Sequence, residues 1–501
     1  MPRTTLRAGA AVATGVALVA GMLASAPTAG AAPTLATNLV AATNGVSANR
    51  HLIALQRIAD QNGGTRAVGT PGYEASVNYV ANTLKQLDFK VSFHTFEYEQ
   101  ITERAASFTV DDDPVEILPM TYTPSTPEGG ITAPVVVVPV AGDATPGCEA
   151  ADYAALDLTG DIALIRRGGC SFAQKSATAA AEGAIAAVIA NNVPGALNGT
   201  LSEIGTTPIA TVGISQADGD ALVAAGGGTG SLEVLVDYTT ESARNVIAQT
   251  RTGRTDNVVM LGSHLDSVPE GPGINDNGTG SAGLLEVASK LGSRPAAPNA
   301  VRFAWWGAEE LGLVGSNAYV ADLSFARRLD IALYLNFDMI GSPNAAYFVY
   351  DGDDSDKVGA GAGPYGSAAL ERTLANFLKQ QRGVTTLGTD FDGRSDYGAF
   401  IAAGIPASGI FTGAEGIKTV KQASIWGGRA GVAYDPCYHQ ACDNLGNVDR
   451  VAFDRNVDAI AHAVGTYASS TRVINGVPSR TERSAAVKPA PVAKPAGAPT
   501  A

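Results

Sequence analysis

The sequence has few charged residues and no basic cluster. Asp, Glu, Lys and Arg together make up 16% of its 501 residues, and 34 basic against 48 acidic residues give a formal net charge of −14. Contacts to nucleic-acid phosphates and to anionic lipids both need clustered Lys and Arg. We therefore expect neither a nucleic-acid partner nor electrostatic attachment to a membrane. The length and a hydrophobic content of 45% instead predict a globular protein of two or three domains.

Long apolar runs are also lacking, apart from one stretch near the N-terminus. Two arginines precede an uncharged run from Ala8 to Ala24, and small residues of the A-x-A type follow it. This order is typical of a secretory signal peptide, predicted over residues 1–31 with cleavage near Ala26 to Ala32. A membrane anchor is the alternative, but the run is short and rich in alanine, whereas a bilayer span needs about 20 strongly apolar residues. We expect a secreted, extracellular protein without a membrane partner.

Cysteine is scarce as well, with four in the whole chain: Cys148, Cys170, Cys437 and Cys442. Three connectivities are possible, and only the local one, Cys148 with Cys170 and Cys437 with Cys442, avoids linking distant segments. A four-cysteine metal site is the competing interpretation, but the chain contains no C-x-x-C pair. Two structural disulfides, formed in an oxidising compartment, agree with secretion.

Apolar strand-like runs alternate with helical stretches over residues 240–475, and helical patterns dominate residues 32–103. Such alternation predicts an α/β fold with a mostly parallel central sheet flanked by helices. Residues 104–239 differ, because short β-type runs and one Ala-rich helix near residues 172–182 replace the alternation. We predict a separate, β-rich inserted domain there. Residues 476–501 are rich in Pro and Ala without apolar periodicity, which predicts a disordered tail.

Polar residues close several of the predicted strands, and the carboxyl ends of parallel strands are where such sheets gather functional groups. The chain has only five histidines, and two of them, His264 and His439, lie in segments of this kind. Three carboxylates in similar segments complete a mixed nitrogen and oxygen set that suits zinc: Asp276, Glu310 and Asp338. Two zinc ions need a bridging carboxylate, and Asp276 lies on a glycine-rich turn that can present both of its oxygens.

Five segments together resemble the M28 family of secreted di-zinc aminopeptidases: SHLDS, INDNGTG, AEELGLVGS, NFDMIG and YDPCYHQACD. They occur in the order that the family shows, and the resemblance extends over about residues 46–468. It implies two Zn²⁺ ions per chain, held by His264, Asp276, Glu310, Asp338 and His439. By the same match Asp276 bridges the two ions, His439 completes the second zinc site, and either Glu310 or Asp338 joins His264 as a terminal ligand.

The resemblance also implies roles for residues that bind no metal. Glu309 is the implied general base, and Asp266 is the implied carboxylate that orients His264. Tyr438 corresponds to a phenol that stabilises the tetrahedral intermediate, and Arg394 to a contact near the carbonyl end of the substrate. These residues together imply peptide hydrolysis by a zinc-activated water whose proton Glu309 accepts.

The predicted insert resembles a protease-associated (PA) domain, including the signature R-G-x-C-x-F-x-x-K from Arg167 to Lys175. In similar domains the two cysteines pair, which supports a bond between Cys148 and Cys170. The resemblance implies a lid or a binding module. A spacer without effect on catalysis is the alternative.

The resemblance therefore implies an enzyme, a zinc-dependent aminopeptidase that hydrolyses N-terminal residues from peptides with a free N-terminus. It favours large apolar residues such as Leu, and we expect a monomer. An M28-like carboxypeptidase is one alternative, but such an enzyme needs further arginines near the site besides Arg394. A non-catalytic PA- and peptidase-like binding protein is the other, and the intact Glu309 and ligand set argue against it.

Overall fold

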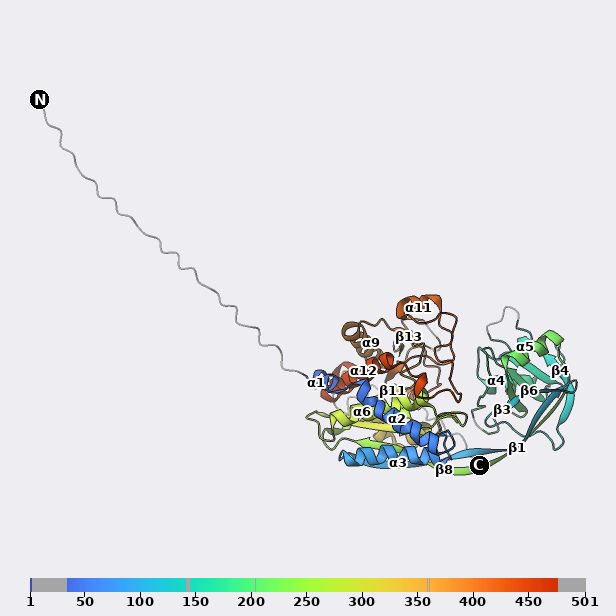
Figure 1. Cartoon of the computed structure of the whole chain (residues 1–501), viewed down its shortest axis with the longest axis horizontal. Helices are drawn as coiled ribbons and strands as arrows, with labels where there is room; N and C mark the ends of the chain where they lie inside the picture. The colour runs from blue at the N-terminus through green and yellow to red at the C-terminus, as the bar shows by residue number, and fades with distance from the viewer. Residues whose placement is uncertain (2–33, 141–144, 203, 358, 360, 476–501) are drawn as a thin grey trace.

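The chain forms two lobes joined by a long ribbon (Figure 1). The computed structural model of the chain describes residues 1, 34–140, 145–202, 204–357, 359 and 361–475. Apart from Met1, the predicted signal peptide lies outside these residues, as does the predicted C-terminal tail. The ribbon consists of two antiparallel strands, β1 (Lys90–Val110) and β8 (Gly228–Gln249), which continue from one lobe into the other.

A single mixed sheet runs through both lobes of the described chain, in the order β13-β12-β14-β11-β9-β10-β8-β4-β5-β6-β7-β3. The remaining strands of the larger lobe are β9 (Arg254–His264), β10 (Asn299–Trp306), β11 (Ile331–Phe337), β12 (Phe348–Tyr350), β13 (Leu387–Thr389) and β14 (Ala407–Phe411). Strands β10 and β11 flank β9 and run parallel to it, and β14 runs parallel to β11. The predicted α/β fold with a mostly parallel central sheet is confirmed.

Helices cover both faces of this sheet. In the larger lobe they are α1 (Leu35–Ala42), α2 (Gly45–Gln61), α3 (Pro71–Gln86), η2 (Ile274–Thr279), α6 (Gly280–Leu291), α7 (Val314–Asp322), α8 (Phe325–Asp330), α9 (Ser367–Arg382), α10 (Tyr397–Ala402), α11 (Val420–Trp426), η3 (Leu445–Asn447), α12 (Arg450–Ser469) and α13 (Arg472–Asn475). Val259 and Leu261 of β9 pack into one apolar cluster with α2, α3, α6 and α12. Val258 and Met260 pack into a second cluster with α7 and α10, because successive strand residues point to opposite faces.

Capping side chains set where several of these helices begin. Asn44 accepts a hydrogen bond from the backbone N–H of Ser47 at the start of α2, and Asp449 caps α12 in the same way. Thr70 caps α3, whose first residue is Pro71. These are the residue types that the first turn of a helix prefers, so the sequence itself specifies these boundaries.

The smaller lobe contains the predicted insert. Its strands are β2 (Asp113–Val115), β3 (Ile117–Pro119), β4 (Ile131–Val137), β5 (Ile162–Arg166), β6 (Ala186–Ala190) and β7 (Ala210–Ile214), and its helices are η1 (Ala150–Tyr153), α4 (Phe172–Ala181) and α5 (Gln216–Ala225). Strands β4 to β7 are parallel and build an apolar core of their own. The sequence predicted α4 but not α5. That helix buries only Gly219 and Leu222, so it has no readable apolar period.

Two disulfides are present, Cys148–Cys170 and Cys437–Cys442. The first ties down the turn that follows β5 in the insert. The second closes a short loop that carries Tyr438 and His439. A search of the described helices finds none that is both long enough and apolar enough to cross a bilayer.

Candidate metal centre

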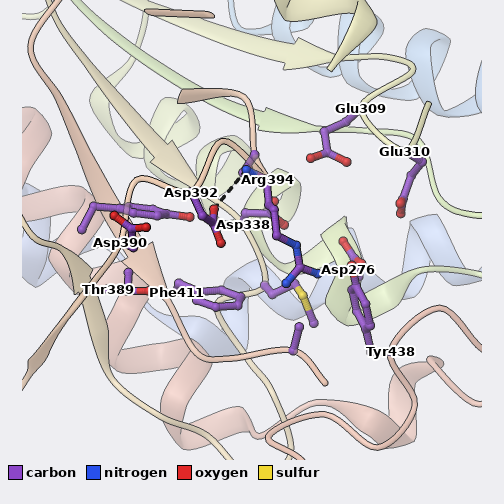
Figure 2. A pocket seen from close by; sticks show the side chains of 14 residues that line it. Asp276, Glu309, Glu310, Asp338, Thr389, Asp390, Asp392, Arg394, Phe411 and Tyr438 are labelled. Carbon is purple, nitrogen blue, oxygen red and sulfur yellow. Dashed lines mark hydrogen bonds between the residues drawn. The ribbon is translucent and has the colours of Figure 1, made fainter. Parts of the chain in front are cut away.

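Three neighbouring strands end at one edge of the sheet, and each supplies candidate side chains there. His264 is the last residue of β9, Asp338 directly follows β11, and Glu309 and Glu310 lie in the turn after β10. Because β10 and β11 are the two neighbours of β9, these side chains converge. Figure 2 shows Glu309, Glu310 and Asp338 around a shared pocket, which Asp276 also lines.

Asp276 and His439 reach the same place from two loops. Oδ1 of Asp276 lies 3.1 Å from Nε2 of His264, and its Oδ2 lies 3.4 Å from Nε2 of His439. Oδ1 of Asp338 lies 3.3 Å from Nε2 of His264, and Oε2 of Glu310 lies 3.0 Å from Nε2 of His439. The five residues thus form two groups, one around each histidine, with Asp276 in common.

The donor atoms fit divalent metal ions. Oε1 of Glu310 is buried and has no hydrogen-bond partner among the described residues. His264, Asp276 and Glu310 present ligand atoms within 4.8 Å of one another, as do His264, Glu309 and Asp338. Imidazole nitrogens and carboxylate oxygens are the mixed set that zinc takes, so these residues suit that ion.

Burial and mutual charge shift the pKa values of the metal-free cluster strongly. Burial raises the pKa of Glu309 well above its usual range and that of Glu310 to about 7. Burial alone lowers the pKa of an imidazole, but the carboxylates of Glu310 and Asp276 raise that of His439 to about 10. The metal-free cluster therefore holds protons that a bound cation has to displace.

Asp266 lies behind the cluster and contacts both the histidine and the glutamate turn. Its Oδ1 lies 3.6 Å from Nδ1 of His264, and the backbone carbonyl of Asp266 lies closer to that nitrogen, at 3.2 Å. Its two carboxylate oxygens accept the backbone N–H groups of Glu309 and Glu310, each at 3.3 Å. Asp266 therefore contacts the glutamate turn as well as the imidazole.

Arg394 and Tyr438 lie together on another side of the pocket. Figure 2 shows the Arg394 side chain extending from its turn toward Tyr438. Nη2 of Arg394 donates to the phenol oxygen at 3.3 Å, and Nη1 donates to Oε1 of Glu415 at 3.0 Å. The Tyr438 ring stacks on the ring of His439 with centroids 3.8 Å apart. Six of the predicted residues thus line one pocket, namely Asp276, Glu309, Glu310, Asp338, Arg394 and Tyr438, and His264 and His439 contact that set.

The turns that carry these side chains include left-handed residues other than glycine. Ala308 has φ 54° before Glu309, Met339 has φ 48° after Asp338, and His439 itself has φ 57°. Non-glycine residues adopt this conformation rarely, and such positions cluster at functional sites. Ala and Met do not favour this conformation, so the sequence gives no signal for the turns at Ala308 and Met339.

Sequence reasoning missed two polar side chains that hold the cluster in place. Ser395 donates to Oδ2 of Asp338 at 2.6 Å. Asp443 accepts the backbone N–H groups of Asn275 and Asp276 at 2.8 and 2.9 Å. Each lies beside a residue that the sequence analysis named, Ser395 next to Arg394 and Asp443 next to Cys442. That adjacency is the one feature of the sequence that points to them.

Arg66 was missed as well, although it is fully buried beneath the site. Its guanidinium donates to the backbone carbonyls of Pro272 at 2.8 Å and Gly273 at 2.6 Å, and also to that of Leu265. It therefore joins the loop after His264 to the loop before Asp276. A buried arginine that satisfies three carbonyls cannot be distinguished in a sequence from a surface arginine.

Comparison with known proteins places both lobes among characterised families. The sequence pattern of peptidase family M28 matches residues 245–464, and that of the PA domain matches residues 131–222. The chain is 48% identical over 439 residues to the probable lipoprotein aminopeptidase LpqL of Mycobacterium tuberculosis, with 86% of this chain and 87% of that protein covered.

Two further matches agree. The probable leucine aminopeptidase 2 of Aspergillus fumigatus is 46% identical over 423 residues, covering 83% of this chain and 81% of that protein. The structure resembles that of BSAP, a zinc aminopeptidase from Bacillus subtilis, with a TM-score of 0.64 and 25% identity over 84% of this chain and 94% of that one. Both matches cover most of each chain, so they include the insert as well as the metal-centre lobe.

Proposed function

The chain belongs to peptidase family M28 and is a zinc aminopeptidase, and on that basis we propose that it holds two zinc ions on either side of Asp276. The observation that carries the proposal is the position of this carboxylate. Its two oxygens face different imidazoles, Oδ1 at 3.1 Å from His264 and Oδ2 at 3.4 Å from His439. A carboxylate between two imidazoles is placed to bridge two cations.

The distances also favour one division of the remaining ligands. Asp338 lies 3.3 Å from Nε2 of His264, and Glu310 lies 3.0 Å from Nε2 of His439. We therefore assign Asp338 to the ion at His264 and Glu310 to the ion at His439. This proposal takes Asp338 as the partner of His264, one of the two alternatives that the sequence leaves open.

Glu309 is the proposed general base. Its Oε2 lies 4.0 Å from Nε2 of His264, so it stands next to the cluster without pairing closely to either histidine. Bound zinc supplies the Lewis acid that makes water nucleophilic at neutral pH. Glu309 accepts the proton of the attacking water and returns it to the amine that leaves.

Tyr438 and Arg394 are proposed to stabilise the carbonyl oxygen of the scissile bond as negative charge develops on it. The phenol and the guanidinium are already in contact at 3.3 Å, on the side of the pocket away from Glu309. Preorganised donors of this kind contribute most where water is excluded. Asp266 keeps its proposed role of orienting His264.

The composition of the pocket favours a substrate with a free amine over one with a free carboxylate. Among the described residues that line it, Arg394 is the one basic side chain, and Glu415 already pairs with that guanidinium. The six carboxylates that line the pocket make it acidic, which suits an α-amino group better than a carboxylate and argues against a carboxypeptidase. Met339, Tyr350 and Phe411 give the pocket an apolar wall. That wall, and the leucine aminopeptidase relative, support a preference for large apolar residues such as Leu.

We propose secretion and a monomeric chain. Residues 1–31 carry the signal-peptide pattern, and the two disulfides suit an oxidising compartment. The M. tuberculosis relative is called a lipoprotein, whereas the first cysteine of this chain is Cys148. We place the peptidase domain at 32–103 and 240–475, the PA insert at 104–239 and a tail at 476–501.

Hydrolysis of p-nitroanilides by the purified mature protein tests the proposal. We expect cleavage of leucine p-nitroanilide, loss of activity with a chelator, and recovery when zinc is returned. N-acetyl-leucine p-nitroanilide is the matched control, because it differs only in the blocked amine. Its cleavage at a comparable rate would refute recognition of the free amine. Cleavage of neither compound by a protein that still contains zinc would favour the carboxypeptidase or the binding protein.

A further inference from the structure

The insert reaches the candidate site through Arg167, the first residue of its signature. Arg167 directly follows β5, in the turn that the Cys148–Cys170 disulfide ties down. Its Nη2 donates to Oε1 of Glu415 in the other lobe at 2.7 Å, and both side chains are only 19% exposed. Its Nη1 donates to Oδ1 of Asn191 within the insert at 3.2 Å. This ion pair between the lobes is thus partly shielded from solvent, where screening by salt is weaker.

Glu415 is shared between two arginines. Oε1 of Glu415 accepts from Nη1 of Arg394 at 3.0 Å as well as from Arg167, and Oε2 accepts from Nη2 of Arg394 at 3.4 Å. The same Nη2 of Arg394 donates to the phenol oxygen of Tyr438 at 3.3 Å. Four side chains therefore connect the insert to the phenol, in the order Arg167, Glu415, Arg394 and Tyr438.

The two arginines keep the carboxyl group of Glu415 ionised. Burial works against ionisation of Glu415, but the charges of Arg394 and Arg167 lower its pKa below the usual range, so the carboxylate stays ionised. Glu415 thus lies between two guanidiniums, one from each lobe. Without Arg167, Glu415 keeps Arg394 as a partner but loses the contact that ties it to the insert.

The insert also contacts the turn that carries the two glutamates. The phenol of Tyr122 donates to the backbone carbonyl of Leu311, the residue after Glu310, at 3.0 Å. Nδ2 of Asn198 donates to Oε1 of Glu270 at 3.1 Å. The insert therefore contacts the larger lobe at other points besides Glu415, and these contacts help to hold Arg167 in register with Glu415.

We propose that Arg167 is a positioning residue for peptide hydrolysis. The insert uses it to hold Glu415, and through Glu415 it keeps Arg394 against the phenol of Tyr438. The inference rests on the proposed function, because there Arg394 and Tyr438 stabilise the scissile carbonyl oxygen. The insert then acts on the active site through Glu415 and is more than a spacer.

Steady-state kinetics on leucine p-nitroanilide with matched arginine variants tests this. We expect Arg167→Met to lower kcat about tenfold with little change in KM, and Arg167→Lys to recover part of the loss. Arg166→Met is the control, because Arg166 binds Asp220 and the carbonyl of Asn191, both within the insert. It should leave kcat within about twofold of the wild type. Equal effects of the two methionine variants would overturn the proposal.

A double-variant cycle and an exchange measurement separate positioning from a general loss of structure. In the Arg394→Met background, Arg167→Met should lower kcat little further. If the two substitutions instead lower kcat by independent factors that multiply, Arg167 does not act through Arg394. Hydrogen–deuterium exchange of peptides over residues 411–418 should rise in Arg167→Met and not in Arg166→Met. This second readout needs no activity. An inactive wild type would refute the proposed function. Unchanged exchange in Arg167→Met would refute the positioning role of Arg167, whatever the activity.

Discussion

Two glutamates that are adjacent in sequence take different positions at the candidate metal centre. Oε2 of Glu310 lies 3.0 Å from Nε2 of His439, whereas Oε2 of Glu309 lies 4.0 Å from Nε2 of His264. Asp266 accepts both backbone N–H groups and so fixes the turn that separates the side chains. One turn thereby supplies a proposed ligand and a proposed base.

Isosteric variants should separate these two roles. We expect Glu309→Gln to retain about two zinc ions per chain and to lower kcat about 10³-fold, because an amide cannot accept the proton. Glu310→Gln should instead lose the ion at His439 and keep about one. Metal analysis after gel filtration, together with kcat on leucine p-nitroanilide, measures both. The same loss of zinc in both variants would show that the glutamates are not divided in this way.

The candidate ligands could be predicted from the sequence because two of them are among only five histidines and all of them lie in specific segments that close predicted strands or loops. The residues that support them could not. In the sequence, Glu415 and Asp443 look like ordinary carboxylates. Their partners lie far away along the chain: Glu415 binds Arg167, and Asp443 accepts the backbone N–H of Asp276. Contacts of that kind exist only once the fold has formed.

Secondary-structure elements were predictable where burial gives a clear period. Strands β9, β10 and β11 are buried on both faces and form continuous apolar runs. The short elements were not, since α10 has six residues and β12 and β13 have three each. The long strand β8 of the ribbon shows no continuous pattern, because residues 239–242 in its middle are exposed and polar. These four residues lack the alternation of apolar and polar side chains that predicts a strand.

The packing of α2 against α3 makes stability depend on pH through His51. This imidazole is 3% exposed, and its Nδ1 lies 2.6 Å from the phenol oxygen of Tyr79. Burial first, and the charge of Arg50 second, lower its pKa to about 4. The folded state thus prefers neutral His51, and the stabilisation is complete above about pH 6.5 and is lost as the pH falls toward 4.

Replacing this histidine should remove that part of the pH dependence. Between pH 7 and pH 4.5, we expect the free energy of unfolding of the wild type to fall by about 2 kcal/mol more than that of His51→Gln. Urea unfolding at both pH values measures the difference, and chelator in all samples removes any contribution from zinc. Parallel losses in the two proteins would mean that His51 is not the titrating group.

In the whole molecule, the two disulfides serve different lobes and should have separable effects. The Cys437–Cys442 bond closes the loop that carries His439, and the Cys148–Cys170 bond closes a loop of the insert with a sequence separation of 22. Replacing the first pair by serine should weaken zinc binding. Replacing the second pair should leave the zinc content unchanged and cost about 3 kcal/mol of the insert's stability.

Zinc titration and thermal unfolding of the two double-serine variants check this prediction, with each variant as the control for the other. Loss of zinc from the Cys148→Ser/Cys170→Ser variant would show that the insert is needed to assemble the metal centre. That result would contradict a metal centre built only from the larger lobe.

The central claim is that Asp276 lies between two zinc ions, and anomalous diffraction from crystals of the zinc-loaded protein tests it most directly. We predict two zinc peaks about 3.5–4 Å apart in data collected on either side of the zinc absorption edge. One peak should lie against His264 and Asp338 and the other against His439 and Glu310, with Asp276 between them. A single peak, or a second peak away from Asp276, would contradict the two-zinc centre.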